Sequence, residues 1–306
     1  MLAILAPGQG SQTPGMLDAW LELPGAADRI ARWSTISGLD LARLGTTASA
    51  EEITDTAVTQ PLVVATTLLA HAELVRRALP AVADTGNLVV AGHSVGEIAA
   101  YAIAGVISPD DAVRLAAVRG AEMAKACALE PTGMSAVLGG EEADVLARLE
   151  TLELIPANRN AAGQIVAAGS LAALEKLAED PPEKARVRQL ATAGAFHTHY
   201  MSSALDGYAA AAAAVDTAEP TITLLSNADG QPVTSAADAM AKLIAQLTRP
   251  VRWDLCTETM RGLGTTAVLE FPPAGALSGI AKRELRGVAI HAMKTPADFD
   301  AVTTTE

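Results

Sequence analysis

A serine framed by glycines, Ser94, is the residue of this sequence whose surroundings point most directly to chemistry. The motif Gly92-His93-Ser94-Val95-Gly96 follows the apolar run 88–91, which predicts a short buried strand, and precedes 97–101, which predicts a helix start. Strand, G-x-S-x-G and helix in this order are typical of a nucleophile elbow, where a strained turn exposes the serine hydroxyl. Ser94 is therefore the candidate nucleophile, and a glycine-rich turn with a capping serine is the alternative.

A serine hydroxyl is a weak nucleophile until a base accepts its proton, so Ser94 needs a histidine close by in the fold. Three of the five histidines have other interpretations. His93 adjoins the serine and should face away from it, and His71 and His291 are expected in the core on a helix and a strand, respectively. His197 and His199 remain, on one loop that follows the serine in chain order. No Asp or Glu ends a predicted strand of the larger domain between Ser94 and His197, so a Ser-His dyad oriented by a backbone carbonyl is simpler than a hydrolase triad.

The elements that position these residues have an α/β pattern. Strand 2–6 runs into the glycine-rich loop 7–12, at the sheet edge where ligand sites gather. That loop lacks the ending of a P-loop and the third glycine of a dinucleotide fingerprint, so nucleotide binding is not expected. Further strands are predicted at 88–91, 221–226, 267–271 and 288–292, and helices at 16–21, 26–35, 61–79, 110–128, 203–215, 236–248 and 253–263.

A separate pattern occupies residues 132–193. Its strands are predicted at 134–138, 152–158, 164–168 and 187–191, and its helices at 141–149 and 171–179. The order β-α-β-β-α-β is that of a ferredoxin-like unit. We therefore expect a large α/β-hydrolase-like domain with a parallel sheet, formed by 1–130 and 194–306, and an inserted ferredoxin-like small domain, 131–193. The polar end, 297–306, should fray.

Composition narrows the function classes. The chain has 306 residues, of which 50% are hydrophobic and 19% charged, as expected for a globular protein with a large core. Its net charge of -13 argues against nucleic-acid binding. Cys127 and Cys256 lie far apart without a CxxC motif, so we expect neither a disulfide framework nor a metal site. We see no uninterrupted apolar stretch of about 20 residues and no secretory signal, and we expect a cytoplasmic protein without a membrane span.

Six blocks in order over nearly the whole chain resemble the malonyl-CoA:acyl carrier protein transacylase family. They are Pro7-Gly8-Gln9-Gly10-Ser11-Gln12, Gly92-His93-Ser94-Val95-Gly96-Glu97, Arg119-Gly120, Asn158-Arg159-Asn160-Ala161-Ala162-Gly163-Gln164, Gly194-Ala195-Phe196-His197 and Pro250-Val251-Arg252-Trp253. The resemblance implies that Ser94 takes a malonyl group from malonyl-CoA and passes it to the phosphopantetheine thiol of acyl carrier protein, with ping-pong kinetics. No further cofactor is implied, and we expect a monomer.

The resemblance also assigns residues to roles. It implies His197 as general base, the backbone N–H groups of Gln9 and Val95 as oxyanion hole, and Arg119 as the partner of the free malonyl carboxylate. Spacing alone leaves open whether Arg119 faces a site or solvent. Gln246 matches the position whose main-chain carbonyl orients the histidine, so we place it in the substrate site.

Further expectations concern selectivity and partners. Phe196 matches a bulky residue of malonyl-selective relatives, and His199 is expected at the surface. Fatty acid synthesis is the favoured pathway; supply of a polyketide synthase in trans and a serine thioesterase or hydrolase are the alternatives. Because acyl carrier proteins are acidic and this chain carries -13, docking requires a local basic patch. Two clusters qualify: Lys184, Arg186 and Arg188, and Lys282, Arg283 and Arg286.

Overall fold

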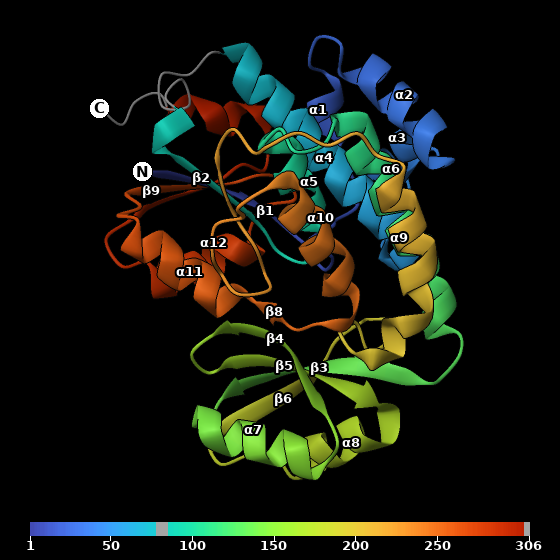
Figure 1. Ribbon diagram of the computed structural model, residues 1–306, viewed down its shortest axis with the longest axis vertical. Helices are drawn as coiled ribbons and strands as arrows, with labels where there is room; N and C mark the ends of the chain where they lie inside the picture. Colours follow the sequence, from blue (N-terminus) through green and yellow to red (C-terminus); the bar gives the residue numbers. More distant parts are fainter. Residues whose placement is uncertain (78–84, 303–306) are drawn as a thin grey trace.

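Two five-stranded sheets form the framework of this computed structural model, which describes residues 1–77 and 85–302 (Figure 1). The strand order is β10-β9-β1-β2-β7 in the first sheet and β6-β3-β5-β4-β8 in the second. The first sheet consists of β1 (Leu2–Ala6), β2 (Leu88–Gly92), β7 (Thr223–Leu225), β9 (Ala267–Glu270) and β10 (Ala289–Ala292). The second consists of β3 (Thr132–Gly139), β4 (Ile155–Ala161), β5 (Gln164–Ser170), β6 (Ala185–Gln189) and β8 (Val251–Arg252).

All strand pairs of the first sheet are parallel, and helices cover both of its faces. The central strand β1 is apolar and buried along its whole length, because neither face of it meets water. Ile4 packs on one face and Leu5 on the other. The first face carries α4 (Thr56–Arg77), α5 (Gly96–Ile103) and α6 (Pro109–Cys127), and the second carries α11 (Trp253–Gly262) and α12 (Ala276–Glu284). The remaining helices around this sheet are α1 (Asp18–Leu21), α2 (Ala26–Ser37), α3 (Leu41–Thr46), α9 (Leu205–Ala213) and α10 (Ala236–Ala245).

Helix α4 is a core helix that runs alongside α5 and α6. By length and composition it is the one helix in the described ranges that could cross a membrane, and 78% of its apolar window is buried inside the protein. A helix enclosed by neighbours is apolar on nearly all sides, so burial accounts for its composition.

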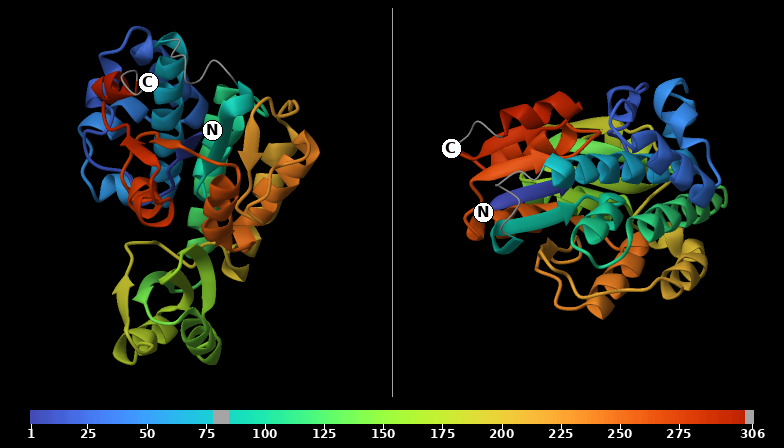
Figure 2. Two further views of the ribbon diagram at one scale, coloured as in Figure 1. Left: turned by 90° about the vertical axis from the view of Figure 1, so that its left-hand side faces the viewer. Right: turned by 90° about the horizontal axis from the view of Figure 1, so that it is seen from above.

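The second sheet is built mainly from one continuous segment, in the order β3-α7-β4-β5-α8-β6, with α7 (Glu142–Thr151) and α8 (Leu171–Glu179). Its strands β3, β4, β5 and β6 pair antiparallel, as in a ferredoxin-like unit. Figure 2 shows this unit beside the first sheet, and both of its helices lie on the far side (Figure 1). The α/β fold expected from the sequence is confirmed.

Strand β8 joins the two parts of the molecule. It belongs to the chain that has returned to the first sheet, and it pairs parallel with β4, Val251 opposite Asn158. Strand β8 was not predicted, because a strand of two residues carries no periodic pattern.

Several predictions about single elements were wrong, and the strand predicted at 152–158 is β4, Ile155–Ala161. Helix α4 begins at Thr56 and not at Pro61, which lies inside the helix; its predicted end, 78–79, falls outside the described residues. Helix α3 was missed because it has only six residues. The predicted fraying is wrong for 297–302, where a 3₁₀-helix buries Phe299 between Trp20 and Phe271; positions 303–306 are not described.

Candidate active site

Ser94 lies on a strained turn between β2 and α5. Its φ of 53° is in the left-handed region, which non-glycine residues rarely occupy without tertiary support. A Cβ on Gly92 would lie 2.1 Å from the carbonyl carbon of Gly96, and one on Gly96 would lie 2.2 Å from the Ala6 oxygen. Only glycine fits at both positions, so the strand and the helix can cross this closely. The G-x-S-x-G pattern therefore forms the elbow that the sequence predicts.

His197 lies directly against this serine. Its Nε2 is 2.7 Å from Ser94 Oγ, and its Nδ1 is 2.8 Å from the main-chain oxygen of Gln246. A carbonyl oxygen can only accept, so Nδ1 carries the hydrogen and Nε2 is free to accept the serine proton. Burial, and secondarily the positive charge of Arg119, lowers the pKa of His197 to about 3. The imidazole is therefore neutral at physiological pH.

Two backbone N–H groups beside the elbow are free to bind an oxyanion. Val95 is the N-cap of helix α5, directly after the serine, and Gln9 lies on the loop after β1. That loop lies against the elbow, because a Cβ on Gly8 would be 2.6 Å from the main-chain oxygen of His93. Within residues 1–77 and 85–302, neither the Gln9 nor the Val95 N–H donates to a protein acceptor. The side chain of Gln9 is held by a 3.2 Å hydrogen bond to Thr56.

Arg119 is buried in the same region, with 1% of its surface exposed. Its Nη1 donates to Gln60 Oε1 at 2.7 Å and its Nη2 donates to Gln246 Oε1 at 2.8 Å. Its Nε has no hydrogen-bond partner, and no carboxylate of the described chain pairs with the guanidinium. Burial lowers the pKa of Arg119, opposed by the neighbouring Tyr208 and Glu97. A buried cation held only by neutral oxygens favours the arrival of an anion.

The structure also places the other residues expected near the site. Phe196, directly before the base, is buried with 6% of its surface exposed. The Nε2 of His93 lies 2.9 Å from Asn160 Oδ1, and its ring lies 5.5 Å from that of Trp253, between centroids. His199 is exposed and contacts Tyr200, with 4.2 Å between ring centroids.

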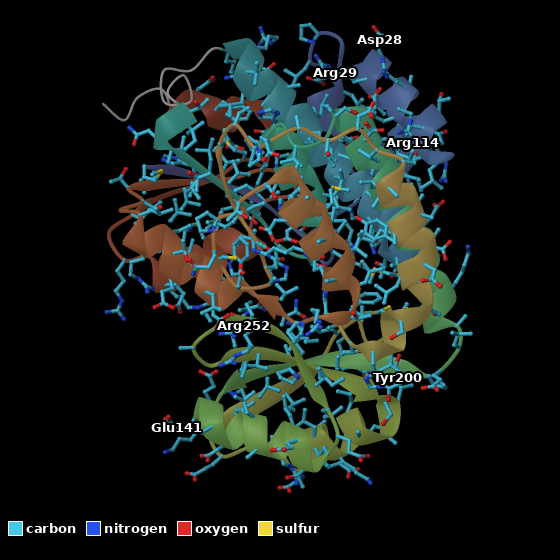
Figure 3. All side chains as sticks on the ribbon, in the orientation of Figure 1. Asp28, Arg29, Arg114, Glu141, Tyr200 and Arg252 are labelled. Atoms are coloured by element: carbon cyan, nitrogen blue, oxygen red, sulfur yellow. The ribbon has the colours of Figure 1, made fainter. Side chains whose placement is uncertain are left out.

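The remaining two histidines lie outside the site. Burial lowers the pKa of His71 to about 4 on helix α4, and His291 is half-buried on β10. Figure 3 shows Tyr200 and Arg252 where the two sheets meet, whereas Glu141 lies on the far part of the second-sheet unit.

Three buried polar residues around the site were missed or not interpreted. Asn227 follows β7; its Oδ1 accepts from the Ser94 N–H at 2.8 Å, and its Nδ2 donates to the Gly92 oxygen at 2.7 Å. Glu97 lies in the first turn of α5, and Gln60 in α4. Asn227 left a usable signal, since a polar residue at the carboxyl end of a parallel strand is typical of a site. Gln60 left none, because it resembles any other helix residue.

Comparison with known proteins identifies the family. Residues 4–295 match the acyl transferase domain family. The chain is 74% identical over 300 residues to the malonyl CoA-acyl carrier protein transacylase of Mycobacterium tuberculosis, covering 98% of each chain. The crystal structure of MCAT from Mycobacterium tuberculosis superposes with a TM-score of 0.96 at 73% identity, covering 99% of this chain and 100% of that one. A solved complex of a malonyl-transacylase with its type II PKS acyl-carrier protein superposes with a TM-score of 0.92 at 27% identity, covering 100% of this chain and 99% of that one. With its elbow, dyad and buried arginine, the chain belongs to the acyl transferase domain family, among the malonyl CoA-acyl carrier protein transacylases.

Proposed function

We propose that this protein transfers the malonyl group of malonyl-CoA to the phosphopantetheine thiol of acyl carrier protein, as a cytoplasmic step of fatty acid synthesis. The observation that carries the proposal is the buried guanidinium of Arg119, free of any carboxylate in the described chain, beside the hydrogen-bonded pair Ser94 and His197. Relatives of this name at 74% identity support the same reaction. We also propose that the protein acts as a monomer.

In the first half-reaction, Ser94 Oγ attacks the thioester carbonyl carbon while His197 Nε2 takes its proton. The N–H groups of Gln9 and Val95 bind the oxyanion that forms, a contribution of roughly 3 kcal/mol for each such donor. As the intermediate collapses, the carbon–sulfur bond breaks and the imidazolium returns the proton to the leaving thiolate of coenzyme A. A malonyl ester of Ser94 remains.

The second half-reaction reverses these steps with a different thiol. His197 removes the proton of the phosphopantetheine thiol, the sulfur attacks the ester carbonyl, and Ser94 leaves with the proton. The reaction balances with its two substrates alone and requires no further cofactor. The main-chain oxygen of Gln246 holds the imidazole in place through both halves.

A thioesterase or hydrolase fits the site less well. The Nδ1 partner of His197 is a carbonyl and not a carboxylate. A pocket for a neutral acyl chain would also leave the Arg119 charge buried and unpaired, which is strongly unfavourable. Transfer to a polyketide carrier protein remains the second candidate pathway, because the solved complex described above joins a malonyl-transacylase to such a carrier.

A labelling experiment tests the proposal. The protein is incubated with isotopically labelled malonyl-CoA, digested and analysed by mass spectrometry, and then chased with phosphopantetheinylated carrier protein. The label should sit on the peptide containing Ser94 and move to the carrier. Ser94→Ala should take no label, whereas the control Ser203→Ala, which alters an exposed serine, should match the wild type. A labelled Ser94→Ala protein would refute the mechanism.

Substrate choice gives a second test. Arg119→Ala should lower kcat/KM for malonyl-CoA, because the carboxylate loses its buried partner. The expected loss of transition-state stabilisation is roughly 3 to 5 kcal/mol. Acetyl-CoA, which has no free carboxylate, should lose much less. Acylation rates with both donors measure the ratio. Equal losses with malonyl and acetyl donors would make Arg119 a structural residue.

A further inference from the structure

Glu97 is a buried carboxyl group that the proposed reaction does not use. It lies in the first turn of α5, three residues after the nucleophile, with 0% of its surface exposed. Its Oε1 accepts from the Asn227 N–H, and its Oε2 accepts from Gln246 Nε2 at 2.5 Å. Within the described ranges no lysine or arginine forms an ion pair with it. Carboxyl groups are rarely fully buried without such a partner, so this one calls for an explanation.

The carboxamide of Gln246 connects Glu97 to the rest of the site. Its Nε2 faces three acceptors, namely Glu97 Oε2, the Ser94 main-chain oxygen at 3.2 Å and Asn227 Oδ1 at 3.3 Å. Its Oε1 accepts from Arg119 Nη2 at 2.8 Å. Since an amide donates only from nitrogen, these acceptors fix the direction of the whole group. The oxygen of Gln246 must then face Arg119.

We propose that Glu97 is a positioning residue for acyl-group selectivity: by accepting from Gln246 Nε2, it turns Gln246 Oε1 toward Arg119 and holds the guanidinium where the free malonyl carboxylate binds. The inference rests on the proposed function, in which Arg119 binds that carboxylate. It assigns the carboxyl group of the G-x-S-x-G-E sequence to substrate choice, and the serine of the same sequence to the covalent step.

An intervening amide suits this task better than direct contact. A carboxylate placed against Arg119 would form a buried ion pair and compete with the substrate for the guanidinium. The Gln246 carboxamide passes on orientation while leaving the Arg119 charge without a counter-charge. Burial raises the pKa of Glu97 to about 8. The hydrogen bonds from the Asn227 N–H and the Ser226 hydroxyl, and the charges of Arg119 and Lys242, act in the opposite direction and lower the pKa. Both oxygens of Glu97 nevertheless accept from N–H donors, an arrangement that suits the carboxylate form.

The test is Glu97→Gln, which keeps the shape of the side chain. A carboxamide has a single acceptor oxygen, so it can serve only one of the two donors and sets its own NH₂ against the other. We expect the malonyl-to-acetyl ratio of kcat/KM to fall about tenfold or more, the usual effect of losing a hydrogen bond to a charged group. The acetyl rate should stay within about threefold of wild type. Glu122→Gln makes the same chemical change on α6, the helix of Arg119, at a residue paired with Lys125, and should keep the wild-type ratio.

A double-mutant cycle separates positioning from general support of the fold. If Glu97 acts through Arg119, Glu97→Gln should leave the malonyl-to-acetyl ratio unchanged in an Arg119→Ala background. A further fall in the ratio there, or equal losses with both donors in the single variant, would overturn the inference. If Arg119→Ala itself leaves the ratio unchanged, the proposed carboxylate site fails, which is a different outcome.

A second variant keeps the test valid if Glu97→Gln folds poorly. Gln246→Met removes the carboxamide but keeps the main-chain oxygen that holds His197. The inference requires Gln246→Met to lower the malonyl-to-acetyl ratio as Glu97→Gln does, and the two changes together to lower it no further. A wild-type ratio in folded Gln246→Met would refute it.

Discussion

The base of the proposed reaction has a pKa far from that of a free histidine. Burial, with the Arg119 charge second, lowers the pKa of His197 from 6.5 to about 3. Only the neutral imidazole can accept the Ser94 proton, so activity is present above the folded-state pKa and lost as the pH falls through it. We therefore expect kcat/KM for malonyl-CoA to show no step near pH 6.5. Single-turnover acylation between pH 5 and 8 measures this, and a midpoint near 6.5 would contradict it.

Phe196 gives a prediction about the size of the acyl group. A bulky side chain next to the base should crowd an α-methyl group, and crowding by one methyl is worth about 1 to 3 kcal/mol. The protein should therefore prefer malonyl-CoA to methylmalonyl-CoA, and Phe196→Ser should weaken that preference. Competition between the two donors measures this preference. Phe196→Leu, whose side chain is larger than that of the serine variant, is the control. Unchanged discrimination in Phe196→Ser would remove Phe196 from the account of selectivity.

Single residues of the site differ in how well the sequence predicts them. Ser94 follows from a local motif. The short list of histidines leaves His197 and His199, the family resemblance selects His197, and its 2.7 Å contact with Ser94 agrees with that choice. Arg119 needed the family resemblance, because its helix spacing fits a solvent-facing arginine equally well. Gln60 and Asn227 matter only through contacts that span 59 and 133 positions. Such contacts depend on the fold: Asn227 is signalled only by its place after a parallel strand, and Gln60 leaves no signal in the local sequence.

At the scale of elements, the crossing of β2 and α5 gives a prediction about stability. Gly96→Ala should abolish the elbow, because its Cβ would overlap the Ala6 oxygen at 2.2 Å. Gly279→Ala makes the same change inside α12, where a new Cβ meets nothing within 4 Å. That variant should be more stable than wild type by about 0.5–1 kcal/mol, the usual preference for Ala over Gly in a helix. Thermal unfolding of both variants compares them, and equal melting temperatures would contradict the packing argument.

Helices and strands could be predicted where their burial requires a hydrophobic pattern in the sequence. Strands β1 and β2 are continuous apolar runs because helices cover both faces, and both were predicted within one residue. Helix α4 was misread at its start because proline is common at the first position of a helix, whereas Pro61 lies in the sixth. Strand β8 exists only because β4 lies beside it, so its two residues carry no signal of their own.

For the whole molecule, the arrangement of the two sheets separates the two basic clusters. Lys184, Arg186 and Arg188 are exposed on or beside β6, the edge of the second sheet that lies farthest from β8. Lys282, Arg283 and Arg286 are exposed at the end of α12, which begins shortly after the carboxyl end of β9. Arg283 donates to the Gln164 side chain at the start of β5, so this cluster lies where the two parts meet. The α12 cluster is therefore the better candidate for carrier-protein docking.

Charge reversal can distinguish the two clusters. Lys282→Glu with Arg286→Glu leaves the Arg283 contact intact, and Lys184→Glu with Arg186→Glu makes an equal change in charge on β6. Because surface charges act on encounter, the α12 variant should raise the KM for carrier protein at low ionic strength, and the effect should shrink as salt screens it over about 10 Å at 0.1 M. Malonyl loading from coenzyme A should be unchanged, since loading does not involve the carrier. The β6 variant should retain the wild-type KM. The opposite ranking would place docking on the edge of the second sheet. A wild-type KM in both variants would exclude both clusters, and an acidic carrier would then have to bind this acidic enzyme through a surface without these charges.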